Sequence, residues 1–214
     1  MAGYDVTKQF KLTPREFLEK LDFLNWYRFF YIIREVVAMD ATSVLEVGPG
    51  EETVKHVLEP YVDRYETLDV NPKLSPTYVG DVRAEKLELR ERYDCVIAAD
   101  ILEHIPFGEL EGTLKNLFSY LRSGGVALIT IPHRAWFIFG MTWLAYRHRI
   151  WRAPDWLRKT YHRLCKGQKN PIDDDHRWEI GDGRHTVRDV ETVMRNVGFA
   201  IEKRQKLIYV DFWV

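Results

Sequence analysis

The fold of this chain is decided by the stretch Val44-Leu45-Glu46-Val47-Gly48-Pro49-Gly50-Glu51-Glu52-Thr53. The apolar run over 43–47 predicts a strand, and the Gly-Pro-Gly sequence predicts a turn. The helical pattern that follows is carried by Val54, Val57 and Leu58. Strand, glycine turn and helix in this order open a βαβ nucleotide-binding unit, in which the second glycine lets a ligand approach the backbone.

Two carboxylates stand where a dinucleotide fold would bind a pyrophosphate. Such a group binds at the helix N-terminus, but this chain has Glu51 and Glu52 there, and Thr53 replaces the third glycine of the fingerprint. The two acids would repel a diphosphate. We therefore expect a ligand that contains an adenosine but no phosphate, of which S-adenosylmethionine is the common example.

The composition is that of one globular α/β domain. The chain has 214 residues, 46% hydrophobic residues and a formal net charge of -1, which allows a full core and argues against a general nucleic-acid-binding protein. Its cysteines are Cys95 and Cys165. Cys95 lies in an apolar run, so we expect a buried free thiol. Residues 1–11 are polar and do not resemble a signal peptide, so a cytoplasmic location is expected.

The N-terminal segment, residues 1–40, is predicted to be a helical cover. Thr13-Pro14-Arg15-Glu16 has the N-cap, the proline and the glutamate of a helix start. The sequence from there to Met39 is helical in pattern and rich in aromatic residues. We interpret it as a helix pair that covers the sheet and closes the cofactor cleft. In a second interpretation, Tyr27 and Arg28 reach the carboxylate of the cofactor.

The pattern predicts four further strands, and their tips carry acids. The predicted strands are 65–70, 77–79, 93–98 and 126–131, the predicted helices are 51–58 and 109–121, and 83–92 is a solvated helix or loop. This alternation implies a parallel, doubly wound sheet whose ligand site lies at the carboxyl ends of the strands. The acids expected there are Glu46, Asp69, Asp81 and Asp100. An acidic crevice suits a cationic sulfonium cofactor.

Two of these acids have positions that fit an adenosine. Asp69 lies 19 residues beyond Gly50, close to the spacing of about 20 expected for an acid that binds ribose. A carboxylate there accepts two hydrogen bonds from the vicinal diol. Asp81 follows Gly80 at the next strand tip, where it is placed to accept a hydrogen bond from an adenine amino group.

Five motifs in this order resemble the class I S-adenosylmethionine-dependent methyltransferases, in particular their small-molecule branch. The motifs are 44–50, Asp69, Gly80-Asp81, 93–97 leading to 102–106, and 121–125. The resemblance implies an α/β Rossmann-like fold, with a doubly wound, seven-stranded, mostly parallel sheet and an antiparallel last strand. It implies a single domain, 1–214, with a cofactor-binding core over 41–132, an inserted segment over 133–185, and a C-terminal helix and β-hairpin over 186–214. Thr186 would cap the helix 187–197, and 200–206 and 207–214 would pair as strands.

The resemblance also implies a set of cofactor-binding residues. They are Glu46, Gly48, Pro49, Gly50, Asp69, Val70, Asn71, Asp81, Val82, Ala99, Asp100 and Ile101. Glu46 and the glycine turn would shape the pocket for the methionine part, and 99–101 would line it near the sulfonium. Val70 and Val82 would lie against the adenine. Relatives often have a further glycine where this chain has Glu52, which predicts a less open turn.

Methyl transfer from a sulfonium is an in-line displacement, so proximity and alignment supply most of the acceleration. A base is needed only where the acceptor must lose a proton. His104, His133 and His176 are the candidates, and we favour His104 or His176. The segment Asp100-x-x-Glu103-His104 is similar to the magnesium-binding segment of quinone-biosynthesis O-methyltransferases. Many relatives keep the Glu-His pair without metal, so no metal is expected.

The insertion over 133–185, predicted to be helical, is basic and aromatic. Residues 133–169 contain nine lysines or arginines and one acid, Asp155, with aromatic residues interleaved. The uncharged run 135–146 is shorter than the about 20 residues that a membrane span needs. One interpretation is a lid that packs on the core, and a second is a peripheral membrane or lipid-substrate surface over 134–163. The third, nucleic-acid binding, is disfavoured because the Asn-Pro-Pro-Tyr-type motif of base methylation is absent.

The sequence therefore predicts a methyltransferase that converts S-adenosylmethionine to S-adenosylhomocysteine and methylates a small-molecule or lipid-like acceptor, with O-methylation favoured. The alternatives are a cofactor-binding regulatory or partner subunit without catalysis, and an RNA methyltransferase.

Overall fold

The computed structural model describes residues 23–50, 52–132, 176–207 and 210–214. Its strands are β1 (Ser43–Val47), β2 (Arg64–Asp69), β3 (Tyr78–Val79), β4 (Tyr93–Ala99), β5 (Leu121–Pro132), β6 (Arg204–Leu207) and β7 (Val210–Trp213). They form one seven-stranded sheet in the order β3-β2-β1-β4-β5-β7-β6. The first five strands are parallel, and β7 is antiparallel to both β5 and β6. The predicted mixed sheet with a reversed last strand is confirmed.

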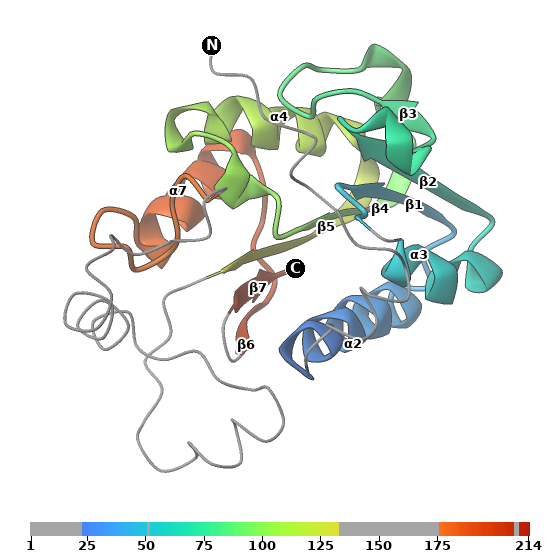
Figure 1. The fold of residues 1–214 in the computed structure, drawn as a ribbon, viewed down its shortest axis with the longest axis horizontal. Helices are drawn as coiled ribbons and strands as arrows, with labels where there is room; N and C mark the ends of the chain where they lie inside the picture. The colour runs from blue at the N-terminus through green and yellow to red at the C-terminus, as the bar shows by residue number, and fades with distance from the viewer. Residues whose placement is uncertain (1–22, 51, 133–175, 208–209) are drawn as a thin grey trace.

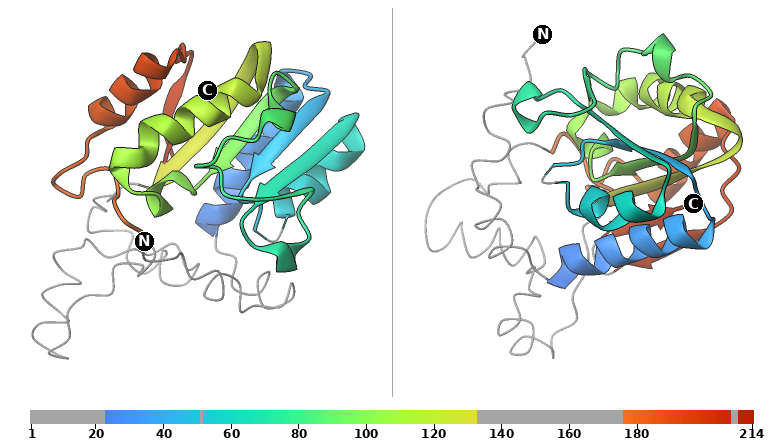
Figure 2. Two further views of the ribbon diagram at one scale, coloured as in Figure 1. Left: turned by 90° about the horizontal axis from the view of Figure 1, so that it is seen from above. Right: turned by 90° about the vertical axis from the view of Figure 1, so that its right-hand side faces the viewer.

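Helices cover both faces of the sheet (Figures 1 and 2). They are α2 (Phe23–Ala38), α3 (Thr53–Leu58), α4 (Leu110–Tyr120) and α7 (Val187–Val197). α4 and α7 lie on one face, and α2 and α3 lie on the other. α2 belongs to the predicted N-terminal cover, whereas residues 1–22 and most of the predicted insertion, residues 133–175, lie outside the described residues.

Two connections between neighbouring parts of the sheet contain no α-helix. β2 is joined to β3 through the single 3-10 turn η2 (Pro72–Leu74), and β3 to β4 through η3 (Leu87–Leu89). The first connection has only residues 70–77 and contains two prolines, whereas a crossover with a helix needs about 10–12 residues. The second is the charged segment that was expected to be a helix or a loop.

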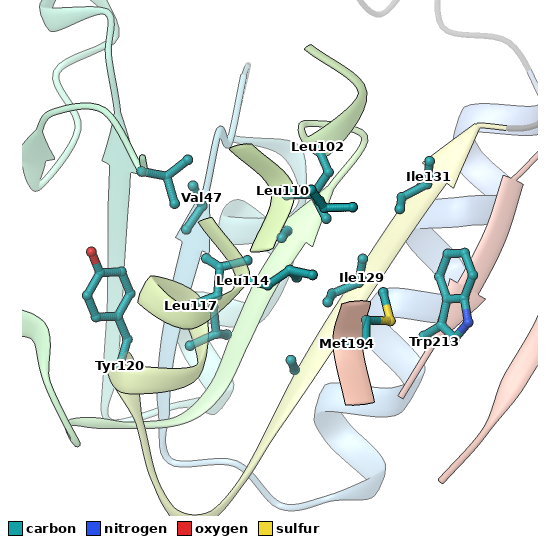
Figure 3. Packing of buried hydrophobic residues seen from close by; sticks show 14 of the residues in the cluster. Val47, Leu102, Leu110, Leu114, Leu117, Tyr120, Ile129, Ile131, Met194 and Trp213 are labelled. Carbon is teal, nitrogen blue, oxygen red and sulfur yellow. The ribbon is translucent and has the colours of Figure 1, made fainter. Parts of the chain in front are cut away.

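The core under α4 shows why the central strands are mainly apolar. Leu110, Leu114 and Leu117 recur at helical spacing on α4 and are fully buried against the sheet. Figure 3 shows these side chains beside Ile129 and Ile131 of β5. A parallel sheet covered on both faces buries alternate residues under opposite helices, so both faces of its central strands favour apolar side chains.

The opposite face is covered by α2. Phe29, Ile32 and Val36 are buried on this helix and pack in one cluster with Leu58 of α3 and Phe212 of β7. Cys95 lies fully buried in the same cluster and is a free thiol, as predicted. Burial raises the pKa of this thiol, so its place in the structure is that of a small core residue.

The C-terminal helix begins and ends where the sequence predicts. Thr186 Oγ1 accepts a hydrogen bond from the backbone N–H of Asp189, and the Asp189 carboxylate accepts one from the backbone N–H of Thr186 (2.8 Å). This capping box starts α7. Gly198, with φ 118°, ends it in the left-handed conformation. The two strands that follow pair as the predicted hairpin, over shorter ranges.

Candidate active site

A pocket opens at the carboxyl ends of β1 to β4 and encloses about 710 Å³, including its open mouth. The predicted site residues that line it are Gly48, Asp69, Val70, Asp81, Val82, Ile101 and His104. The pocket has six further lining residues that the sequence analysis did not name as site residues: Val47, Leu68, Gly80, Arg83, Ile105 and Arg177. The pocket therefore lies at the predicted edge of the sheet, with two additional arginines at its wall.

The remaining predicted residues do not line this pocket. They are Glu46, Pro49, Gly50, Asn71, Ala99, Asp100 and His176. Asn71 is buried, and its Oδ1 accepts a hydrogen bond from the backbone N–H of Lys73 (3.0 Å), which caps η2. The side chain of Asn71 thus shapes the loop after β2.

The glycine turn after β1 depends on Gly48. This residue has φ 65°, and a Cβ added to it would lie 2.4 Å from Cγ2 of Ile101. Its backbone N–H donates to the carbonyl of Leu68 (2.9 Å). Only glycine fits both this conformation and this space, and its absent side chain leaves room beside Ile101 at the pocket wall.

Glu52, at the position where relatives often have glycine, adopts the left-handed conformation, with φ 55° and ψ 26°. A residue with a Cβ pays about 1–2 kcal/mol in this region. The Glu52 carboxylate accepts a hydrogen bond from Lys55 Nζ (2.9 Å). The turn therefore keeps a backbone that favours glycine, and the lysine one turn later neutralises the acid.

Asp69 ends β2 and lies at the pocket, only 6% exposed. Its Oδ1 accepts a hydrogen bond from the backbone N–H of Asn71 (2.7 Å). Burial raises the pKa of Asp69, and the backbone N–H groups of Asn71 and Val70 oppose this rise. The carboxylate is thus fixed in orientation by the loop that follows it.

Asp81 is held by a residue that the sequence analysis did not single out. The guanidinium of Arg83 donates to both carboxylate oxygens, from Nε (3.0 and 2.9 Å) and from Nη2 (2.6 Å). These hydrogen bonds lower the pKa of Asp81. Nη1 of Arg83 also contacts Glu109 (3.1 Å). A ligand amino group that approaches Asp81 would share the carboxylate with this arginine.

Glu46 lies on the other side of β1 and is 4% exposed. Burial raises its pKa from 4.5 to about 7, although the hydrogen bond from the Tyr65 hydroxyl (2.8 Å) and the charges of Arg28 and Lys55 lower it. The charge of Glu52 raises it further. A buried carboxylate that titrates near neutral pH is typical of a functional site.

Arg28 reaches the strand tips from α2. Its Nη1 donates to Oδ2 of Asp100, and the two side chains are 11% and 19% exposed. Asp100, just after β4, has φ 52°, and its Oδ1 accepts a hydrogen bond from Thr130 Oγ1 (2.6 Å). Of the two residues expected to approach the cofactor carboxylate, Arg28 therefore reaches the tip of β4, whereas the hydroxyl of Tyr27 contacts that of Tyr31 (3.1 Å).

The two favoured histidines lie together. Their rings are 4.9 Å apart in an edge-to-face arrangement, and His104 lines the pocket. The segment that carries His176 is tied to the loop after β4, because the backbone N–H of Arg177 donates to the carbonyl of Glu103 (2.8 Å) and Trp178 Nε1 donates to the carbonyl of Ile105 (2.9 Å). The third candidate, His133, lies outside the described residues.

Comparisons with known proteins agree with this architecture. A family model described as "Methyltransferase domain" matches residues 15–203. No curated protein matches the chain. The N-methyltransferase NodS of Bradyrhizobium japonicum WM9, solved with S-adenosyl-L-homocysteine, has a TM-score of 0.59 and 12% identity, with 94% of this chain and 90% of NodS covered.

Two further solved structures show the same fold. The 1,6-didemethyltoxoflavin-N1-methyltransferase of Burkholderia thailandensis has a TM-score of 0.59 and 11% identity, with 93% of this chain and 80% of that chain covered. The small RNA methyltransferase HEN1 has a TM-score of 0.59 and 12% identity, with 96% of this chain and 26% of HEN1 covered.

The chain belongs to the methyltransferase domain family, whose model spans most of its length. The family match and the seven-stranded sheet together confirm the class predicted from the sequence, a class I S-adenosylmethionine-dependent methyltransferase with a Rossmann-like fold.

Proposed function

We propose that this methyltransferase transfers the methyl group of S-adenosylmethionine to a small-molecule acceptor, with the adenosine bound in the pocket at the strand tips. The observation that carries the proposal is the make-up of that pocket. Asp69 and Asp81 supply acceptors, and Val70, Val82 and Ile101 supply apolar walls. In this proposal Asp69 binds the ribose hydroxyls, Asp81 accepts from the adenine amino group, and the valines flank the ring.

The methionine part of the cofactor would lie beyond Gly48, toward the ion pair. There Arg28 would bind the α-carboxylate, and Glu46 and Asp100 would face the ammonium and the sulfonium. The location of Arg28 supports this arrangement, because its guanidinium pairs with Asp100 and its charge acts on Glu46. Pro49, Gly50 and Ala99 would complete this part of the site. Each of these acids attracts a cationic ligand, and together they disfavour a phosphate.

The acceptor would lie next to His104, the histidine at the pocket wall. For a hydroxyl acceptor, His104 or His176 would take the proton as the oxygen attacks the methyl carbon. The presence of a histidine at the pocket wall supports O-methylation. Two of the structural relatives are named N-methyltransferases, which supports an amine acceptor. A neutral amine attacks without prior loss of a proton, so its transfer would depend less on the histidines.

A turnover assay tests the proposal. The purified chain is incubated with S-adenosylmethionine and a panel of phenols, quinols and amines, and release of S-adenosylhomocysteine is measured. We expect at least one acceptor to be methylated, with a loss of about 10²–10⁴-fold for His104→Gln on a hydroxyl acceptor if that residue is the base. Cofactor binding without transfer to any acceptor would favour the regulatory or partner subunit instead.

Two further predictions concern the basic insertion, which lies outside the described residues. The likeness to HEN1 supports keeping a small RNA in the acceptor panel, and methylation of RNA alone would replace the small-molecule proposal.

No helix in the described part of the chain is both long and apolar enough to cross a membrane. The proposed membrane surface over 134–163 is tested by flotation with anionic liposomes. The wild type should float with the liposomes, whereas the triple variant Arg147→Ala/Arg149→Ala/Arg152→Ala should remain unbound. The interpretation of the insertion as a lid and the cytoplasmic location of the protein stay predictions.

A further inference from the structure

We infer that Glu103, His104 and His176 form a binding site for a divalent transition-metal ion at the wall of the pocket. These residues come from two segments that are far apart in the chain. One ligand atom from each, a carboxylate oxygen or an imidazole nitrogen, lies within 4.8 Å of the other two. The sequence analysis expected no metal, so this inference departs from it.

The separations fit donors arranged around a common centre. Glu103 Oε1 lies 4.0 Å from His104 Nε2 and 3.8 Å from His176 Nε2. Both distances exceed a hydrogen bond. Nitrogen and oxygen ligands of a tetrahedral ion are bound at about 2.0–2.1 Å, which places them about 3.3 Å from each other. The two measured separations exceed this value by about 0.5–0.7 Å, so small side-chain movements would bring the donors to an ion.

A fourth residue orients one of the proposed ligands. Glu179 is buried, and its Oε1 lies 2.8 Å from Nδ1 of His176. A carboxylate at this distance accepts the Nδ1 proton, which leaves the lone pair on Nε2, the nitrogen that faces Glu103. Carboxylate, histidine and metal in this order are the usual arrangement around a metal-binding histidine. The contact with Glu179 therefore favours the tautomer that a metal requires.

The kinds of ligand indicate the kind of ion. Two imidazoles and one carboxylate suit Zn²⁺, Mn²⁺, Fe²⁺ or Co²⁺, whereas Mg²⁺ prefers an environment of oxygen atoms. Glu103 is 0% exposed, and the two histidine side chains are 21% and 10% exposed. An ion there would reach solvent and acceptor from the side of His104, the residue that lines the pocket.

The role of this ion in methyl transfer rests on the proposed function. A hydroxyl bound to a divalent ion loses its proton far more readily than in water. In the metal-bound protein both histidines would act as ligands through Nε2. The ion would lower the pKa of the bound acceptor hydroxyl, whose proton would pass to solvent water at the pocket in place of a histidine base. Binding of the ion itself does not depend on that role, so it can be measured without an acceptor.

The test is metal binding to the full chain. The protein is freed of metal with a chelator and titrated with Co²⁺, followed by visible absorption, and with Zn²⁺ and Mg²⁺, followed by calorimetry. We expect one Co²⁺ or Zn²⁺ per chain and no comparable Mg²⁺ binding. His176→Gln and Glu103→Gln should weaken binding at least 100-fold, and Glu179→Gln about 10–100-fold. The control is His56→Gln, which changes an exposed histidine on α3 and should leave binding unchanged.

The inference is overturned by the absence of Co²⁺ and Zn²⁺ binding, by binding of Mg²⁺ alone, or by affinities that stay at the wild-type value in the ligand variants. His104→Gln provides a second ligand variant at a partly exposed residue, in case the change at buried Glu103 prevents folding. Titration of the same proteins with S-adenosylhomocysteine separates the two proposals. In the ligand variants, loss of metal binding with retained cofactor binding supports the metal site. If the wild type binds metal but never transfers a methyl group, only the proposed function is contradicted.

Discussion

Arg28 and Asp100 form an ion pair that joins α2 to the tip of β4. The contact runs from Nη1 to Oδ2, and both side chains are largely buried. Asp100 is held from its other side by Thr130. The pair therefore places a cation and an anion, each with little exposure to water, beside the glycine turn where the methionine part of the cofactor is proposed to bind.

Arg28→Ala should weaken binding of S-adenosylhomocysteine by about 10- to 100-fold. The change removes a hydrogen bond between charged groups, worth about 1.5–3 kcal/mol, and leaves Asp100 without its guanidinium partner. Arg28→Lys should recover only part of the affinity, because an ammonium cannot reproduce the planar guanidinium. Calorimetry measures both. The matched control is Arg34→Ala on the same helix, at a side chain that is 45% exposed; an equal loss in that variant would contradict the assignment.

Glu46 should make stability depend on pH near neutrality. Its pKa in the folded protein is about 7, above the ordinary value of 4.5, so the folded state holds a proton that the unfolded state releases between these values. The stabilisation is complete below pH 4.5 and is lost as the pH rises through 7. Relative to Glu46→Gln, which cannot titrate, the wild-type free energy of unfolding should fall by about 3 kcal/mol between pH 4.5 and 7.5.

Urea denaturation of the two proteins at several pH values measures this difference. The control variant, Glu59→Gln, changes an exposed glutamate and should give a profile parallel to that of the wild type. If the wild type and Glu46→Gln differed by the same free energy at every pH, the titration of Glu46 would not contribute to stability in this range.

Glu52→Gly should be no less stable than the wild type. The substitution removes the strain of a left-handed residue with a Cβ, about 1–2 kcal/mol, and this gain is offset by the larger entropy of glycine in the unfolded chain and by loss of the contact with Lys55. Glu52→Ala keeps the strain and also loses the contact, so it should be the least stable of the three. Thermal unfolding gives the order, and a Glu52→Gly protein less stable than Glu52→Ala would show that φ at this position does not limit stability.

Local patterns accounted for the parts of the fold that could be predicted. The bounds of β1 and α7 agree with the sequence analysis, because a short apolar run and a capping box with a terminal glycine are read within a few residues. Once the strands were predicted, the positions of their carboxyl ends were also known. Asp69, Asp81 and Gly48 were therefore correctly predicted to lie at the pocket.

Contacts between distant segments could not be predicted. His176 lies beside His104 because Trp178 donates to the carbonyl of Ile105, and no periodicity in the sequence encodes that contact. Arg83 donates hydrogen bonds to the carboxylate of Asp81, whereas the sequence analysis identified only the aspartate. Arg177, next to His176, was likewise missed as a residue of the pocket wall. Side-chain partners of this kind depend on tertiary packing.

The central claim, that the pocket at the strand tips binds the adenosine of the cofactor through Asp69, is tested most directly by calorimetric titration with S-adenosylhomocysteine. We predict binding of one ligand per chain to the wild type and a loss of about 10- to 100-fold in Asp69→Ala, which removes the acceptor of two hydrogen bonds. No binding to the wild type, or equal affinity in Asp69→Ala, would contradict it.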